Sequence, residues 1–134
     1  MIKIVIPGKP LPWRAPVVCR NVTFSPRAKQ LKLYKYLAAD QYQGELIRCA
    51  VNCDVISYIP IPVGTTKANR MLMLAGKIRP AKRPDRTNIA KLVEDALNGT
   101  VIEDDSLIVG GRVEKWYCER PRVELIISKI EGHS

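Results

Sequence analysis

The chain has 134 residues, a formal net charge of +9 and a sequence pI of about 9.6. This length predicts one domain, residues 1–134, with one modest core. A strongly basic small domain indicates a polyanionic partner, although a merely basic soluble surface is an open alternative. No apolar run approaches the roughly 20 residues of a membrane-spanning helix, and the N-terminus does not read as a signal peptide. We therefore expect a cytoplasmic protein with no membrane partner.

The N-terminal part predicts a strand, a loop and a helix. Isoleucines alternate with other residues from Ile2 to Ile6, which is typical of a strand. The proline-rich segment 7–12 should form an extended loop, and segment 17–24 one short strand. Ser25-Pro26 predicts the start of a helix running from about Arg27 to Gln43.

The remaining elements complete an α+β pattern. Apolar and polar residues alternate from Ile47 to Val55, which predicts a half-buried strand that Pro60 and Pro62 end. Residues 65–74 predict a short helix, followed by a basic linker at 77–82. Three more strands are expected at 107–109, 113–118 and 123–130, and the last four residues should be mobile. Together these elements predict a mostly antiparallel or mixed sheet packed with two or three helices.

The four cysteines do not indicate a zinc site. Cys19, Cys49, Cys53 and Cys118 form no Cys-x-x-Cys pair, and the single histidine is His133 near the C-terminus. We interpret the cysteines as reduced thiols in the core of a cytosolic protein.

Segment 82–106, KRPDRTNIAKLVEDALNGTVIEDDS, carries the candidate site. Pro84 ends the preceding segment, Asp85, Thr87 or Asn88 can cap the first turn of a helix, and Gly99 follows its end. The apolar stripe of this helix has the spacing i, i+3, i+4, i+7, i+8 and consists of Ile89, Leu92, Val93, Ala96 and Leu97.

Charged residues occupy the other face of the same helix and the segment after it. Thr87, Lys91 and Asp95 are four apart, and Asp104 and Asp105 follow beyond the turn. We expect the carboxylate at the helix start, the ammonium one turn in and the two later carboxylates to come within reach of one another. Carboxylates gathered in this way repel unless a hard cation such as Mg²⁺ neutralises them. For any single acid, a helix cap or a solvated turn is an open alternative.

This stretch resembles the RusA-like Holliday junction resolvases, small phage and bacterial endonucleases. Their signature is K-P-D-x-D-N-x-x-K, then D-A-L-N-G, then D-D-S or D-D-A before a strand. The chain has RPDRTN at 83–88 with Lys91, then DALNG at 95–99, then DDS at 104–106. The N-terminal IPGKP at 6–10 and the C-terminal strands also resemble the family. One position departs, because Thr87 replaces the second motif aspartate.

The resemblance implies Mg²⁺-dependent hydrolysis of DNA phosphodiesters at four-way junctions, in recombination and repair, by a homodimer of bacterial or phage origin. Asp85 and Asp105 are then the first-choice ligands of Mg²⁺, or of Mn²⁺ as a substitute, with Asp104 as a further ligand. Lys91 would stabilise charge developing on the phosphate; the alternative is a surface lysine paired with Asp95. Asn88 would orient a carboxylate or cap the helix, and Thr87 would supply at most a hydroxyl behind the ligands.

A basic stretch precedes the acids. Between Lys67 and Arg86 the only acid is Asp85. Trp13 can stack on nucleic acid or pack over the core. The predicted DNA-contacting residues are Lys77, Arg79, Lys82, Arg83 and Arg86, together with Arg14 of the N-terminal loop.

Two other classes of function are open alternatives. A non-catalytic junction-binding protein would keep the fold and the basic surface, and Thr87 favours it. An RNA-binding module is the other, but the chain lacks a recognisable aromatic platform motif.

Overall fold

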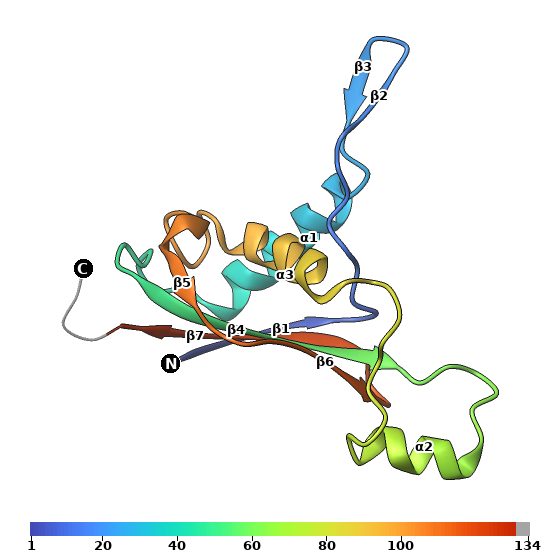
Figure 1. The fold of residues 1–134 in the computed structure, drawn as a ribbon. Coiled ribbons are helices and arrows are strands. Elements are labelled where there is room, and N and C mark those ends of the chain that lie inside the picture. Colours follow the sequence, from blue (N-terminus) through green and yellow to red (C-terminus); the bar gives the residue numbers. More distant parts are fainter. Residues whose placement is uncertain (131–134) are drawn as a thin grey trace.

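A mixed five-stranded sheet forms the frame of the protein (Figure 1). The computed structural model describes residues 1–130. Strands β1 (Ile2–Pro7), β7 (Arg122–Lys129) and β4 (Val51–Pro60) pair antiparallel in that order. The short strands β5 (Ile108–Gly110) and β6 (Val113–Cys118) pair parallel with successive parts of β4. The predicted α+β class with a mixed sheet is confirmed.

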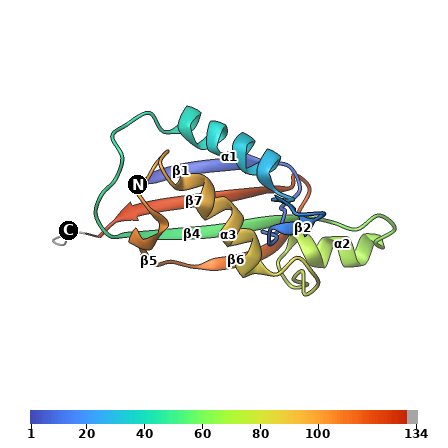
Figure 2. The ribbon, with the colours of Figure 1, turned by 90° about the horizontal axis from the view of Figure 1, so that it is seen from above.

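Two helices cover one face of this sheet (Figure 2). Helix α1 (Ala28–Gln41) packs on β1, and α3 (Arg86–Leu97) packs on α1, β4 and β6. A third helix, α2 (Lys67–Leu74), contacts β6 at one end of the sheet. Because parallel strands need a long crossover between them, the segment from β4 to β5 must pass over the sheet, and α3 is the helix of that crossover.

Helix α3 is anchored by the stripe that its sequence predicts. All five stripe residues are at most 1% exposed, and Ala90 is buried with them. Gly99, at φ 76°, reverses the chain after the helix. Val101 and Ile102 then return to the core, where both are fully buried. Ile102 also forms an isolated parallel bridge with Ile47.

The predicted start of the central strand is wrong. Strand β4 begins at Val51 and runs to Pro60, whereas Ile47 bonds the segment after α3: its N–H donates to Val101 O over 2.9 Å and its carbonyl accepts from Glu103 N over 3.0 Å. The second half of β4 reads VISYIP, and its consecutive residues Val55, Ile56 and Ser57 are all buried. The alternation of apolar and polar residues from Ile47 to Val55 therefore spans both the isolated bridge at Ile47 and the first part of β4.

Three smaller expectations change. Segment 17–24 is a hairpin of two strands, β2 (Val17–Cys19) and β3 (Val22–Phe24), rather than one strand. Its turn residues Arg20 and Asn21 both have positive φ, as a two-residue hairpin turn of type I′ requires. Helix α1 has Arg27 rather than Ser25 at its N-cap and ends before Tyr42 rather than at Gly44.

The cysteines are free thiols, but they are not all in the core. Cys53 is buried on β4, and burial, with the nearby Glu94 and Asp54 carboxylates, raises its pKa to about 12. Cys19 is exposed on the hairpin, so its assignment to the core is wrong. His133 and the expected mobile tail lie outside the described residues.

Within residues 1–130, no helix has the length and apolar character needed to span a membrane.

Candidate active site

The N-terminal end of α3 presents one free carboxylate. Asp85 occupies the N-cap position, but its side chain makes no capping hydrogen bond. The loop that carries it is fixed from the sheet: Lys115 Nζ on β6 donates to Lys82 O over 2.7 Å and to Pro84 O over 3.0 Å. Helix capping, the alternative role of Asp85, therefore does not occupy its carboxylate. The carboxylate stands beside the positive end of the α3 dipole.

A hollow of about 500 Å³ adjoins Asp85. Its wall is held in place by the N-terminal loop, because Arg27 Nε donates to Pro12 O over 2.9 Å and Trp13 N donates to Asn88 O over 2.8 Å. The charged residues around it are four cations and one acid: Lys9, Arg14, Arg27, Arg83 and Asp85. Such a hollow suits an anionic group.

Lys91 lies between the two ends of α3 and is held by Trp13. Its Nζ lies 3.6 Å from the centre of the Trp13 ring, which is a cation–π contact. Trp13 packs against the hydrophobic core, so the core alternative for Trp13 is confirmed. Within residues 1–130, Lys91 forms no ion pair with Asp95. Burial raises the pKa of the Asp95 carboxyl, and the charge of Lys91 offsets only part of that rise. Lys91 is therefore positioned by an aromatic ring rather than by a carboxylate.

The C-terminal end of α3 brings carboxyl groups together. Asp105 opens a short 3₁₀ turn, η1 (Asp105–Leu107), that packs on α3. Burial raises the pKa of Asp95, and the nearby Asp105 carboxylate raises that pKa further. Burial and then the charges of Asp105 and Asp95 raise the pKa of Glu94. These three acids form a repulsive cluster that a cation would relieve.

Asp104 behaves differently from its neighbour. Its carboxylate accepts a hydrogen bond from Ser106 N over 3.0 Å and caps η1. Hydrogen bonds from Ser106 hold the pKa of Asp104 below its usual value. The alternative of a turn residue thus describes Asp104 well, whereas Asp105 faces α3.

The two ends of α3 are too far apart to share one ion within one chain. Asp95 lies ten residues beyond Asp85, which corresponds to about 15 Å along a helix. Ligands of Mg²⁺ lie at about 2.1 Å from the ion. The expectation that Asp85 meets Asp104 and Asp105 is therefore wrong for a single chain. The reason is that buried Val101 and Ile102 fix the following segment at the far end of the helix.

This geometry decides whether the side chains of one chain can hold a Mg²⁺ ion. Among residues 1–130, no three acidic, cysteine or histidine side chains are placed to hold one metal ion. Asp95 and Asp105 nevertheless bring two carboxyl groups into contact, which is the oxygen chemistry that Mg²⁺ prefers. One chain thus supplies a partial ligand set at each end of α3.

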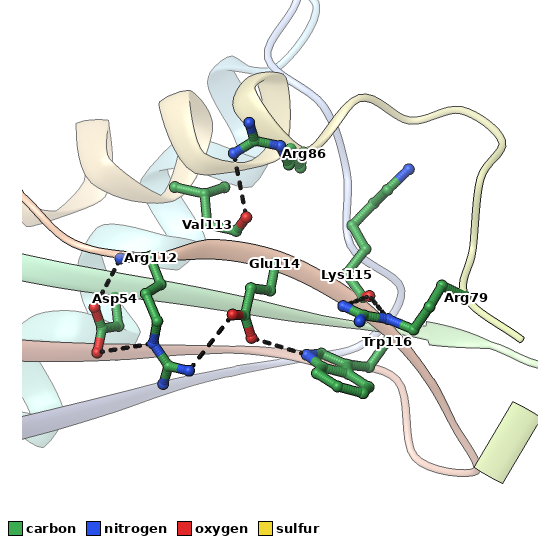
Figure 3. Close-up of polar contacts among 8 residues, drawn as sticks. All are labelled: Asp54, Arg79, Arg86, Arg112, Val113, Glu114, Lys115 and Trp116. Carbon is green, nitrogen blue, oxygen red and sulfur yellow. Dashed lines mark hydrogen bonds and ion pairs between the residues drawn. The ribbon is translucent and has the colours of Figure 1, made fainter. Parts of the chain in front are cut away.

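The predicted DNA-contacting residues divide into two groups, and Figure 3 shows the two arginines of the first group, Arg79 and Arg86. Arg79 stacks on Trp116 at 3.4 Å and donates twice to Lys115 O, over 2.9 and 2.8 Å. Arg86 donates to Val113 O over 3.2 Å. These two arginines support the structure. The residues whose side chains make no hydrogen bond or ion pair within residues 1–130 are Arg14, Lys77, Lys82 and Arg83.

Sequence reasoning missed several residues of the site. Lys115 occupies a strand position that faces the helices, between Val113 and Tyr117, and a lysine at such a position is a signal that it bonds something there. Arg27 gave no such signal, because only the fold brings it to the hollow. Glu94 and Asp95 join Asp105 through the turn after α3, which the motif spacing does not reveal.

Comparisons with known proteins show the family of the chain. The family model of endodeoxyribonuclease RusA matches residues 7–128. The uncharacterized protein YqaN of Bacillus subtilis (strain 168) is 38% identical over 109 residues, which cover 79% of this chain and 77% of YqaN. The family match includes both ends of α3, the Lys91 position and the strands that carry them. The chain therefore belongs to the RusA endodeoxyribonuclease family.

Proposed function

We propose that this protein is a Mg²⁺-dependent endonuclease that cuts DNA at four-way junctions during recombination and repair, as a homodimer, with Mn²⁺ as a substitute metal. The observation that carries the proposal is the exposed face of α3. It has a free carboxylate at one end, two adjoining carboxyl groups at the other and a lysine between them. A cationic hollow lies beside the first carboxylate.

The chain's own groups have distinct tasks in this reaction. Arg14 and Arg83 hold the phosphates that flank the cut, because their guanidinium groups line the hollow and make no hydrogen bond or ion pair within residues 1–130. Asp85 and Asp105 hold the metal, which when bound supplies an activated water and polarises the phosphoryl oxygen. Lys91, whose ammonium lies against the Trp13 ring, stabilises charge that develops on the phosphate. Asn88 orients Asp85 from the first turn of α3.

The separation of Asp85 from Asp105 supports the homodimer. One metal centre can use both positions only if they come from different chains. In a two-fold dimer, a contact of Asp85 with the partner's Asp105 is repeated by symmetry, which gives two equal centres. Two equal centres match a substrate in which two strands are cut as a pair.

Cleavage of a synthetic four-way junction tests the proposal. With Mg²⁺ the protein should cut strands near the branch point, it should leave a linear duplex of the same sequence intact, and EDTA should stop the reaction. The second candidate is a junction-binding protein without activity, which Thr87 favours because one family carboxylate is missing. Tight junction binding without a cut in Mg²⁺ or Mn²⁺ would establish that candidate instead.

A further inference from the structure

The β2–β3 hairpin extends away from the sheet and the helices (Figure 1). Every residue from Arg14 to Ser25 is exposed, and nothing among residues 1–130 covers the six strand residues. A two-stranded hairpin without packing partners is only marginally stable in water. An arm of this kind is typical of a segment that acts by contacting a partner.

One face of the arm is entirely apolar. Directly opposed residues of an antiparallel pair share a face, and successive residues alternate. The pairs Val17–Phe24 and Cys19–Val22 therefore form one face, and Val18–Thr23 forms the other. Phe24 is 51% exposed and Val22 62% exposed. The first face thus offers an aromatic ring and aliphatic groups with no polar side chain among them.

The N-terminal segment that carries this apolar face has cationic but no acidic side chains. Residues 1–39 contain eight lysines and arginines and no aspartate or glutamate; the first acid is Asp40. Arg20 is at the tip of the arm, and Arg14 and Arg27 flank its base, where they line the hollow beside Asp85. The cationic surface therefore continues from the candidate active site onto the arm.

We propose that the β2–β3 hairpin is a DNA-inserting arm, which places Phe24 and its apolar neighbours against unstacked bases at the branch point while its arginines contact the phosphates. This inference rests on the proposed junction substrate. Proteins that kink or open DNA insert apolar side chains between bases from a cationic surface, and an aromatic ring stacks on any base. A branch point supplies bases whose stacking is already interrupted.

Charge decides between DNA and a second copy of the chain as the occupant. Two arms brought together would place two acid-free, cationic regions side by side, and like charges repel. A polyanion attracts the same surface. DNA is therefore the partner that the arm fits.

The test measures binding in EDTA, so that no strand is cut. The probe is a four-way junction with 2-aminopurine at the branch point, and a linear duplex of the same sequence is the reference. The test variant is the pair Val22→Ser with Phe24→Ser, and the matched control is Val18→Ser with Thr23→Ala on the other face. Because all four positions are exposed, thermal melting should show that both variants are folded.

Wild type and the control should raise the 2-aminopurine fluorescence of the junction. The test variant should lose this rise and bind the junction about tenfold more weakly, the effect of losing about one stacked base, with little change on the duplex. If the test variant binds the junction as tightly as wild type and gives the same rise in fluorescence, the proposed insertion of the arm into DNA is wrong. A shift from dimer to monomer in sedimentation with the fluorescence rise intact would also overturn it, in favour of a dimer contact.

The outcome is separable from that of the nuclease proposal. If wild type shows the arm-dependent fluorescence rise in EDTA but cuts nothing in Mg²⁺, the arm stands and the nuclease proposal fails. If wild type cuts junctions while the test variant binds and cuts them equally well, only the arm fails.

Discussion

Asp104 and Asp105 are adjacent in the sequence, yet their carboxylates have different surroundings. Asp104 accepts a hydrogen bond from Ser106 N, and Asp105 contacts Asp95. The motif shows only that two acids stand together, so it could not rank them. The structure distinguishes the two acids as candidate metal ligands by the groups that each carboxylate already contacts. Within residues 1–130, the Asp105 carboxylate has no such backbone donor and lies near Asp95 instead.

The first prediction follows from this difference. Asp105→Asn should lower junction cleavage by about 100-fold or more, because it removes a charged metal ligand, while junction binding stays equal or tightens. The rate of strand cutting and the dissociation constant in EDTA measure the two effects. Asp104→Asn is the control and should keep most of its activity, since an amide oxygen can still accept from Ser106 N. Near wild-type cleavage by Asp105→Asn would remove Asp105 from the site.

The second prediction concerns Thr87. It is exposed in the first turn of α3, two residues after Asp85. Thr87→Asp adds a carboxylate beside Asp85 at the positive end of the helix dipole, and cation affinity rises with ligand charge. A Mg²⁺ titration of cleavage should therefore reach half of its maximum at a several-fold lower concentration.

The opposite result has a definite meaning. If Thr87→Asp needs more Mg²⁺ while Asp104→Asn is inactive, Asp104 has taken the place of the missing family carboxylate. The new aspartate would then add only repulsion.

Among the helices and strands, sequence periodicity predicted the features that depend on local packing. The stripe of α3 fixes both the helix and the face that it buries, because a 3.6-residue period leaves one solution. The start of β4 was not predictable in the same way. The Ile47 region also alternates, but it bonds the Val101–Glu103 segment, a partner distant in sequence. The hairpin was missed because its turn uses Arg20 and Asn21, without the glycine that usually marks such turns.

The link between β6 and the loop before α3 gives a prediction at this scale. Lys115→Met removes the hydrogen bonds to Lys82 O and Pro84 O. The loop that places Asp85 should loosen, so junction cleavage should fall about tenfold, while the free energy of unfolding falls by about 1–2 kcal/mol. Cleavage rates and urea unfolding measure the two quantities.

A matched lysine controls for charge. Lys129→Met alters an exposed lysine on β7 whose side chain makes no hydrogen bond or ion pair within residues 1–130, and it should affect neither quantity. Equal cleavage by Lys115→Met and wild type would show that the loop keeps its place without this lysine.

In the molecule as a whole, the sequence indicated candidate residues for the site but not where the fold places them relative to one another. The motif places Asp85 and Asp105 in one segment, and the buried Val101–Ile102 pair then holds them at opposite ends of α3. The direction that a chain takes after a helix depends on the core that receives it. Motif spacing contains no information on that core, so the separation of the two acids emerges only from the fold.

A mixture of two inactive variants tests whether two chains complete one site. Asp85→Asn and Asp105→Asn should each be inactive alone. If each centre combines Asp85 of one chain with Asp105 of the other, a mixed dimer has one intact centre, and random exchange of subunits restores about one centre in four. Denaturation and refolding of the two variants together, followed by a junction-nicking assay, measures this. If no activity returns while mixed dimers form, the two acids do not share a centre between chains.

Metal-dependent, paired cutting of a four-way junction can be measured on a supercoiled plasmid that extrudes a cruciform. With Mg²⁺ the wild-type protein should convert the plasmid to a linear product by cutting two strands across the cruciform base, and EDTA or Asp105→Asn should prevent this. A plasmid without the cruciform should stay supercoiled. If the protein binds the cruciform yet leaves the plasmid supercoiled in both Mg²⁺ and Mn²⁺, it is not a junction endonuclease.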